Sequence, residues 1–191
     1  MRWLEIEYEI YSDDNRLFEK TDKPIIVPIG KNLLFESIEN NLKDAEVGKI
    51  YKFLVKKPYG DRLDSLVMIV PLSEFLSRNI NPIPNLVVEI DGKIGIVRAV
   101  SGGRVIVDFN HPLAGRDAIF YIKVNREVTD LKEKIKGLLN LLFKIGYNDI
   151  DVSINDKKII IKIKDYKPND NLKSILKEYI DEIKDFEISF E

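Results

Sequence analysis

The stretch 108–115 constrains the fold most, because it forces a sharp crossing between two strands. Its sequence is Asp-Phe-Asn-His-Pro-Leu-Ala-Gly, and short apolar runs flank it at 104–108 and 118–124. Asn110 tolerates a left-handed backbone, Pro112 fixes its own φ angle, and Gly115 has no Cβ that could clash. We therefore expect two strands that are joined across a compact turn region.

Composition narrows the class of protein. The 191 residues include 30 basic and 32 acidic side chains, so no basic surface for nucleic acid is indicated. The lack of cysteine excludes disulfides and thiol catalysis, and the single histidine, His111, cannot build a metal site alone. We expect His111 to satisfy backbone groups at the turn. No apolar run is long enough to span a membrane, and the N-terminus has a strand pattern and not that of a signal peptide.

We therefore expect a cytoplasmic protein without metal or cofactor, and without nucleic-acid or membrane partners. The many Ile, Lys and Glu residues are typical of a thermophile.

The N-terminal part has the pattern of a sheet with one short helix. Residues 4–10 alternate between apolar and acidic side chains, which predicts a half-buried strand. Further strands are expected at 17–19, 24–30 and 50–55. Leu34, Phe35, Ile38 and Leu42 stand at helical spacing, which predicts an amphipathic helix of about two turns.

Residues 64–110 have the pattern of a small all-β module. Strands are expected at 66–70, 86–90, 94–100 and 105–108, with a helical turn at 72–77. The pairs Asp91-Gly92 and Gly102-Gly103 are hairpin signatures. Because the run 118–124 resumes the earlier strand pattern, the module reads as an insertion.

The C-terminal part has the order α-β-β-α-β, which predicts a two-layer domain. Leu131, Ile135, Leu138, Leu139 and Leu142 mark the first helix, with Thr129 as N-cap and Gly146 as its stop. A hairpin at 150–163, a second helix at 172–183 and a strand at 186–190 follow.

The predicted class is α+β, with three domains. An antiparallel sheet wrapped on a short helix is formed by 1–63 and 111–125, the small all-β domain by 64–110, and the C-terminal domain by 126–191.

A set of residues stands in an order typical of one family: Tyr8, Phe18-Glu19, Pro24-Ile25, Gly30, Leu34, Phe35, Ile38, Pro58-Tyr59-Gly60 and Phe120. This order resembles that of FKBP-type peptidyl-prolyl isomerases. The stretch 110–115 resembles the point where the chain returns from the inserted domain of SlyD-type members. The part 126–191 resembles the extra domain of long archaeal members. The sequence departs from the family pattern where Glu19 replaces aspartate, Ile25 an aromatic residue, and Ile38 a tryptophan or leucine.

The resemblance implies a peptidyl-prolyl isomerase and folding chaperone that needs no cofactor or metal. It implies that Tyr59, Glu19 and Tyr8 are catalytic, with Tyr59 donating a hydrogen bond to the substrate carbonyl. The substrate pocket would consist of Phe18, Ile25, Leu34, Phe35, Ile38 and Phe120. The inserted domain resembles one that binds unfolded chains, and its apolar excess suggests a groove of Met68, Leu72, Phe75 and Leu76.

Two other interpretations remain open. The protein could be a chaperone whose isomerase pocket is weak or lost, or an interaction scaffold in which the same apolar residues only form cores. The expected partners are unfolded or proline-containing polypeptides, and a homodimer through the C-terminal domain is a hypothesis.

Overall fold

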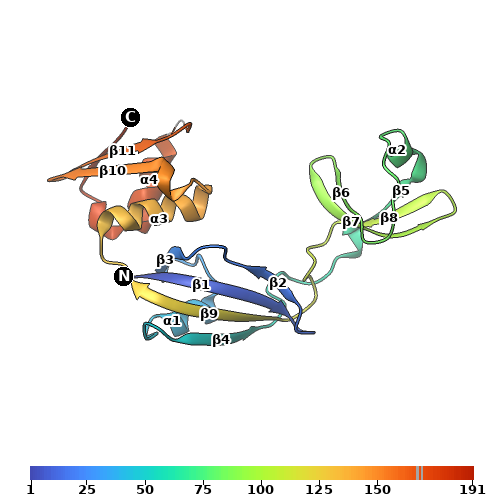
Figure 1. The fold of residues 1–191 in the computed structure, drawn as a ribbon, viewed down its shortest axis with the longest axis horizontal. Helices are drawn as coiled ribbons and strands as arrows, with labels where there is room; N and C mark the ends of the chain where they lie inside the picture. The colour runs from blue at the N-terminus through green and yellow to red at the C-terminus, as the bar shows by residue number, and fades with distance from the viewer. Residues whose placement is uncertain (167, 169) are drawn as a thin grey trace. The chain divides into compact units, whose positions relative to one another are not determined.

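The computed structural model describes residues 1–166, 168 and 170–191 and divides into two compact units. The host unit consists of Met1–Val55 and Ile119–Glu191, and the insert unit of Lys56–Ala118 (Figure 1). The chain therefore leaves the host unit, forms the insert unit, and returns. We describe each unit by itself.

The host unit contains a five-stranded sheet with the order β2-β1-β9-β4, in which β3 also pairs with β1. The long strand β1 pairs antiparallel with β3 near its start, where Leu4 faces Val27, and with β2 near its end, where Ile10 faces Glu19. The strands are β1 (Arg2–Ser12), β2 (Leu17–Lys20), β3 (Ile25–Ile29), β4 (Ile50–Val55) and β9 (Ala118–Glu127).

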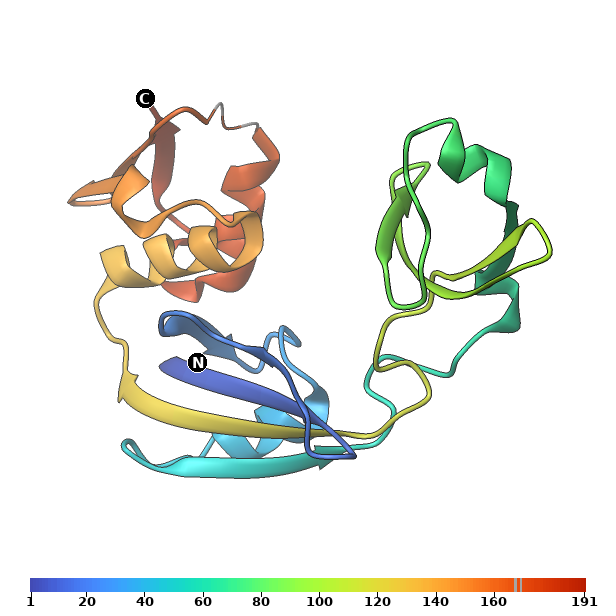
Figure 2. The same ribbon diagram turned by 45° about the vertical axis from the view of Figure 1, so that its right-hand side comes forward.

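One face of this sheet carries the apolar positions predicted from alternation. Leu4, Ile6 and Ile122 are buried on it, and the short helix α1 (Glu36–Leu42) lies against the sheet in both Figure 1 and Figure 2. Phe120 of β9 is also buried. The sheet and helix together therefore enclose the core that positions the candidate site.

The opposite face is covered at the N-terminal end of β1, where a half-buried strand was expected. Trp3 is only 1% exposed, and with Ile26 it belongs to the core of the C-terminal part. Helix α3 (Leu131–Phe143) approaches so closely that a Cβ on Gly137 would lie 2.5 Å from the Cβ of Ile26. The host sheet and the C-terminal part therefore share one core.

The C-terminal part follows the predicted order. After α3 come the antiparallel pair β10 (Ile150–Asn155) and β11 (Lys158–Ile163), then α4 (Asp170–Tyr179) and β12 (Glu187–Phe190), which pairs parallel with β11. Two short 3-10 helices, η2 (Tyr147–Asp149) and η3 (Asp181–Ile183), connect these elements.

The predicted ends of the first C-terminal helix were wrong. Asp130, not Thr129, is the N-cap of α3, because its side chain accepts a hydrogen bond from the Glu133 amide at 2.8 Å. The helix ends at Phe143 because Lys144 adopts a left-handed backbone with φ of 58°, before Gly146 is reached.

The insert unit is a four-stranded sheet with the order β5-β8-β7-β6, in which all neighbours are antiparallel. Phe75, Val88, Val97, Val105 and Val107 form its core. Its elements are η1 (Asp64–Leu66), β5 (Val67–Pro71), α2 (Leu72–Leu76), β6 (Val87–Ile90), β7 (Lys93–Ser101) and β8 (Arg104–Asp108). The predicted hairpin turns at Gly92 and at Gly102-Gly103 have the positive φ angles that such turns need.

The α+β class with antiparallel sheets is confirmed, whereas the three domain boundaries stay predictions. Among the described residues, no helix is both long enough and apolar enough to cross a membrane.

Candidate functional site

Two aromatic rings from separate elements meet in the host unit. Phe35, directly before α1, and Phe120 on β9 contact each other edge to face, with ring centroids 5.4 Å apart and an interplanar angle of 69°. Ile38, one helical turn after Phe35, is buried, and Leu34 is half-buried. The structure therefore brings together Phe35 and Phe120 from the predicted pocket and gives the pocket an apolar wall.

Glu39 fixes the loop that carries Leu34 and Phe35. One carboxylate oxygen, Oε2, accepts hydrogen bonds from the amides of Gly30 at 2.8 Å and Asn32 at 3.2 Å. The other, Oε1, accepts from the amides of Leu33 at 2.8 Å and Leu34 at 3.0 Å. The side chain is only 3% exposed, and these donors compensate for the burial of its charge. The loop 30–34 is therefore tied to α1 through a single carboxylate.

Glu39 was not among the functional residues predicted from the sequence, although its position on the helix gives a signal. On a helix of 3.6 residues per turn, Glu39 lies about 40° beyond Phe35, at the border of the apolar stripe that Phe35, Ile38 and Leu42 define. A charged residue that borders an apolar stripe is a candidate for a buried group with dedicated partners.

Tyr8 and Glu19, which were both predicted to be catalytic, contact each other directly. The Tyr8 hydroxyl donates a hydrogen bond to Glu19 Oε1 at 2.6 Å, across the pairing of β1 with β2. Phe18 and Ile25 are half-buried on β2 and β3. Ile25 also lines a separate cleft of about 670 Å³ that β3 shares with α3.

Tyr59, the predicted hydrogen-bond donor, lies in the insert unit and stacks on His111. The two ring centroids are 3.7 Å apart and the planes differ by 14°. The amide of Leu113 donates to His111 Nδ1 at 3.1 Å, which makes Nδ1 an acceptor and holds the imidazole in place. The prediction that His111 satisfies a backbone group is confirmed, and the ring also supports Tyr59.

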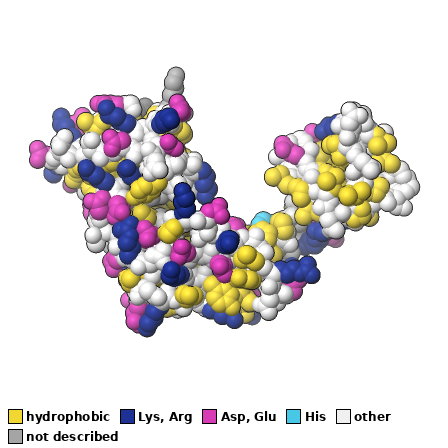
Figure 3. All heavy atoms as spheres, in the orientation of Figure 1, with side chains coloured by type: hydrophobic (Ala, Val, Ile, Leu, Met, Phe, Trp, Pro, Cys, Tyr) yellow, Lys and Arg dark blue, Asp and Glu magenta, His cyan; other side chains and the backbone are white. Residues whose placement is uncertain are grey.

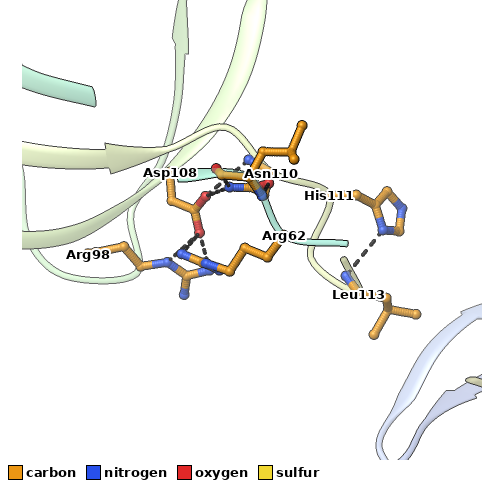
Figure 4. Close-up of polar contacts among 7 residues, drawn as sticks. Arg62, Arg98, Asp108, Asn110, His111 and Leu113 are labelled. Carbon is orange, nitrogen blue, oxygen red and sulfur yellow. Dashed lines mark hydrogen bonds and ion pairs between the residues drawn. The ribbon is translucent and has the colours of Figure 1, made fainter. Parts of the chain in front are cut away.

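A buried carboxylate links residues 62–63, near the start of the insert unit, to residues 108–110, near its end (Figure 4). Asp108 Oδ2 accepts from Arg98 Nε at 3.0 Å and Nη2 at 2.8 Å, and it pairs with Arg62 Nη2 at 2.6 Å. Oδ1 accepts from the backbone and side-chain nitrogens of Asn110 at 3.0 and 2.8 Å. The Asn110 side chain also exchanges two hydrogen bonds with the backbone of Leu63.

Burial raises the pKa of Asp108, but the hydrogen bonds from Asn110 and Arg98 and the charge of Arg62 outweigh it and lower the pKa to about 2. The carboxylate is therefore ionised at neutral pH. Residues 62–63, 98 and 108–110 form one connected polar network.

The insert unit has an apolar groove of about 430 Å³ between β5, α2 and β6. Met68 and Phe75 of the predicted chaperone residues line it, while Leu72 packs against the core and Leu76 is exposed outside the lining. Met68 and Ile69 on β5 are 51% and 63% exposed. The face of this unit seen in Figure 3 is largely hydrophobic, with few charged side chains.

In the described part of the chain, no group of three or more His, Cys, Asp or Glu side chains is arranged to hold a metal ion.

Comparisons with known proteins agree on one family. Residues 68–113 match the family model described as the FKBP26 IF domain. The chain is 28% identical over 125 residues to a short-type peptidyl-prolyl cis-trans isomerase of Methanocaldococcus jannaschii, which covers 63% of this chain and 80% of the relative. It is 28% identical over 128 residues to an FKBP-type 16 kDa peptidyl-prolyl cis-trans isomerase of Escherichia coli, which covers 62% and 86%. It is 29% identical over 140 residues to the FKBP-type isomerase SlyD of Pasteurella multocida, which covers 66% and 68%.

Proposed function

We propose that this chain, which belongs to the FKBP-type peptidyl-prolyl isomerase family, catalyses the cis–trans isomerisation of peptide bonds that precede proline and binds unfolded polypeptides. The observation that carries the proposal is the aromatic wall of Phe35 and Phe120 beside the buried Ile38, in a chain of this family.

The reaction needs no nucleophile, metal or cofactor. Its barrier of roughly 18–20 kcal/mol comes from amide resonance, which the twisted transition state loses. An apolar pocket favours the twisted bond because it removes the water that stabilises the planar, polarised amide. A millionfold acceleration requires only about 8 kcal/mol, which burial and a few oriented hydrogen bonds can supply.

Different side chains bind the proline ring and donate the hydrogen bond. Phe35, Phe120 and Ile38, with Leu34, Phe18 and Ile25, form the surface that receives the proline ring. Tyr59 donates a hydrogen bond to a substrate carbonyl, and the stack with His111 holds its ring in a fixed orientation. Glu19 accepts a hydrogen bond from the Tyr8 hydroxyl and so fixes the direction of that hydroxyl.

The insert unit supplies the chaperone activity. Its groove between β5, α2 and β6 is apolar, and Met68 offers a flexible side chain that adapts to different sequences. Exposed apolar patches on a protein mark interaction sites more often than chance predicts. Met68, Phe75, Leu72 and Leu76 are the residues that we assign to chain binding.

We also propose that the protein is of the archaeal, thermophilic type and has three domains. These are an isomerase domain of 1–63 and 111–125, an inserted chaperone domain of 64–110, and an accessory domain of 126–191. We place the protein in the cytoplasm, with unfolded or proline-containing chains as its partners. Pairing through the accessory domain would give a homodimer, and sedimentation as a monomer at micromolar concentration would exclude it.

The test measures isomerisation of a proline-containing peptide without a coupled protease. Wild type should accelerate the reaction, and Tyr59→Phe should lower kcat/KM about tenfold, the value of one oriented hydrogen bond to the transition state. Tyr147→Phe, which removes a hydroxyl from the C-terminal part, is the matched control and should retain full activity. If Tyr59→Phe accelerates the reaction as much as wild type does, the chain is an isomerase but Tyr59 is not its hydrogen-bond donor.

A parallel assay follows the aggregation of a heat-unfolded client protein. Suppression of aggregation by a wild type that does not accelerate isomerisation would identify a chaperone with a lost pocket. Failure of both assays would leave an interaction scaffold.

A further inference from the structure

The loop 30–35 contacts two parts of the host unit at once. Leu34 and Phe35 belong to the proposed pocket, where Phe35 meets the ring of Phe120. Lys31 and Leu33, which precede them in the loop, contact the C-terminal part of the chain. The loop therefore joins the pocket to elements that lie more than a hundred residues later in the sequence.

Lys31 binds the C-terminal end of α4. Its Nζ donates to the backbone carbonyl of Glu178 at 2.5 Å and lies 3.7 Å from a carboxylate oxygen of Asp181. Glu178 is in the last turn of α4, where carbonyls lack a partner within the helix and the helix dipole is negative. A cation at this position satisfies the helix end, and the Lys31 side chain is only 24% exposed.

Leu33 provides the apolar half of the same contact. Its side chain packs against the buried core that includes Ile135, Leu138, Leu176 and Ile183. Its amide donates to Glu39 Oε1, the same oxygen that accepts from the amide of Leu34. A displacement of Leu33 is therefore transmitted to the backbone of Leu34 through one shared carboxylate oxygen.

We propose that the C-terminal part holds the pocket loop in its binding conformation, with Lys31 and Leu33 as the positioning residues. The inference rests on the proposed isomerase function and deepens it, because it makes the accessory domain a structural component of the substrate site. A loop that is already ordered loses less conformational entropy when substrate binds, so its ordering lowers KM.

The experiment compares two variants with matched controls in the full chain. Lys31→Met removes the lysine that joins the loop to the end of α4, whereas Lys184→Met removes another lysine that pairs with Asp181, at 2.8 Å, and lies outside the loop. Leu33→Ala truncates a leucine on the loop, whereas Leu142→Ala truncates one on α3 that packs against the same core.

We expect KM for a proline peptide to rise about threefold in Lys31→Met and about tenfold in Leu33→Ala, with kcat within about twofold of wild type. Lys31→Arg, which keeps the positive charge, should have the same KM as wild type. A merely structural loss would unfold part of the sample, which lowers the apparent kcat and leaves KM unchanged. Both controls should keep the wild-type KM.

Amide hydrogen exchange at Leu34 gives a readout that does not depend on activity. Exchange should be faster than wild type in Lys31→Met and Leu33→Ala but unchanged in the two controls. If wild type proves inactive, the proposed function fails while the exchange rates still decide the role of the loop contacts. Unchanged exchange and KM in both variants, or equal changes in the controls, would overturn the inference.

Discussion

The Asp108 network offers a quantitative test, because replacing its carboxylate by an amide is nearly isosteric. The Asp108 side chain is 0% exposed, and its two oxygens divide between the arginines and Asn110. In Asp108→Asn, an amide nitrogen must replace one of these oxygens and face either the guanidinium donors or the donors of Asn110. At least two charge-assisted hydrogen bonds are therefore lost.

Two estimates of the free energy by which ionised Asp108 stabilises the folded state agree. Lowering the pKa from 3.8 to about 2 corresponds to about 2 kcal/mol of stabilisation of the ionised form in the folded state. Breaking a fully buried ion pair costs about 3–5 kcal/mol, and the partial exposure of Arg62 and Arg98 places this case below that range. We therefore expect Asp108→Asn to lower the free energy of unfolding of the insert unit by about 2 kcal/mol at pH 7.

The pH dependence has a defined sign. Because the pKa of Asp108 is lower in the folded state than its ordinary value of 3.8, its contribution is complete well above pH 3.8 and disappears as the pH falls through about 2. The stability gap between wild type and Asp108→Asn should therefore shrink to below about 0.5 kcal/mol at pH 2, since protonated Asp108 resembles the amide.

The assay follows urea unfolding by NMR of Val105 and Val107, which are buried in β8. With a slope near 1 kcal/mol/M for a unit of this size, the midpoint at pH 7 should fall by about 2 M. The only tryptophan, Trp3, reports on the host unit, and its transition should not move. Asp61→Asn, which removes an exposed partner of Lys57, is the control and should have little effect. A midpoint shift below about 0.5 M at pH 7, or a gap of undiminished size at pH 2, would refute the reasoning.

Three further predictions concern the host unit and the proposed donor. Glu39→Gln should lower the free energy of unfolding of the host unit by about 2–3 kcal/mol in urea, because its amide nitrogen would face two backbone N–H donors; a stability equal to that of wild type would show that the carboxylate is dispensable. Gly137→Ala should cost about 1–3 kcal/mol, read as a lower melting temperature, since the added Cβ would lie 2.5 Å from the Cβ of Ile26; an unchanged melting temperature would contradict the close approach. His111→Ala should lower kcat/KM for a proline peptide about twofold to tenfold, the worth of one aromatic stack on Tyr59. His111→Phe, which keeps a ring, should lower it less, and equal losses in the two variants would argue against stacking as the cause.

The sequence predicts those features that depend on neighbouring residues. The hairpin turns at Gly92 and Gly102 follow from local backbone preferences, and the alternation of Leu4 and Ile6 follows from the two-residue period of a strand. The order of elements in the C-terminal part was predicted for the same reason. Each of these features is determined within a few residues of the chain.

Features that depend on distant partners could not be predicted. Trp3 is buried by a core contributed largely by residues 128–188, and alternation cannot show whether a second face is covered. Glu39 binds backbone amides, which every residue except proline has and which therefore leave no trace in side-chain patterns. Thr129 and Asp130 are both good N-caps, and the choice between them depends on where β9 ends.

The site was predicted as a set of residue types but not as an arrangement. Tyr8 and Glu19 were each predicted to be catalytic, and the hydrogen bond that joins them appears only in the structure. The stack of Tyr59 on His111 could not be anticipated, because the two residues are 52 positions apart in the sequence and meet only when the crossing segments close.

The position of β9 has a consequence for synthesis on the ribosome. This strand lies between β1 and β4 in the host sheet, yet it follows the entire insert unit in the chain. During translation at about 5–20 residues per second, the insert unit emerges as one continuous segment and can fold while the host sheet still lacks an interior strand. Until β9 emerges, the edges of β1 and β4 that will receive it stay unpaired, and such edges promote aggregation. The proposed chain-binding unit is therefore complete in the nascent chain before the host sheet that carries the proposed pocket.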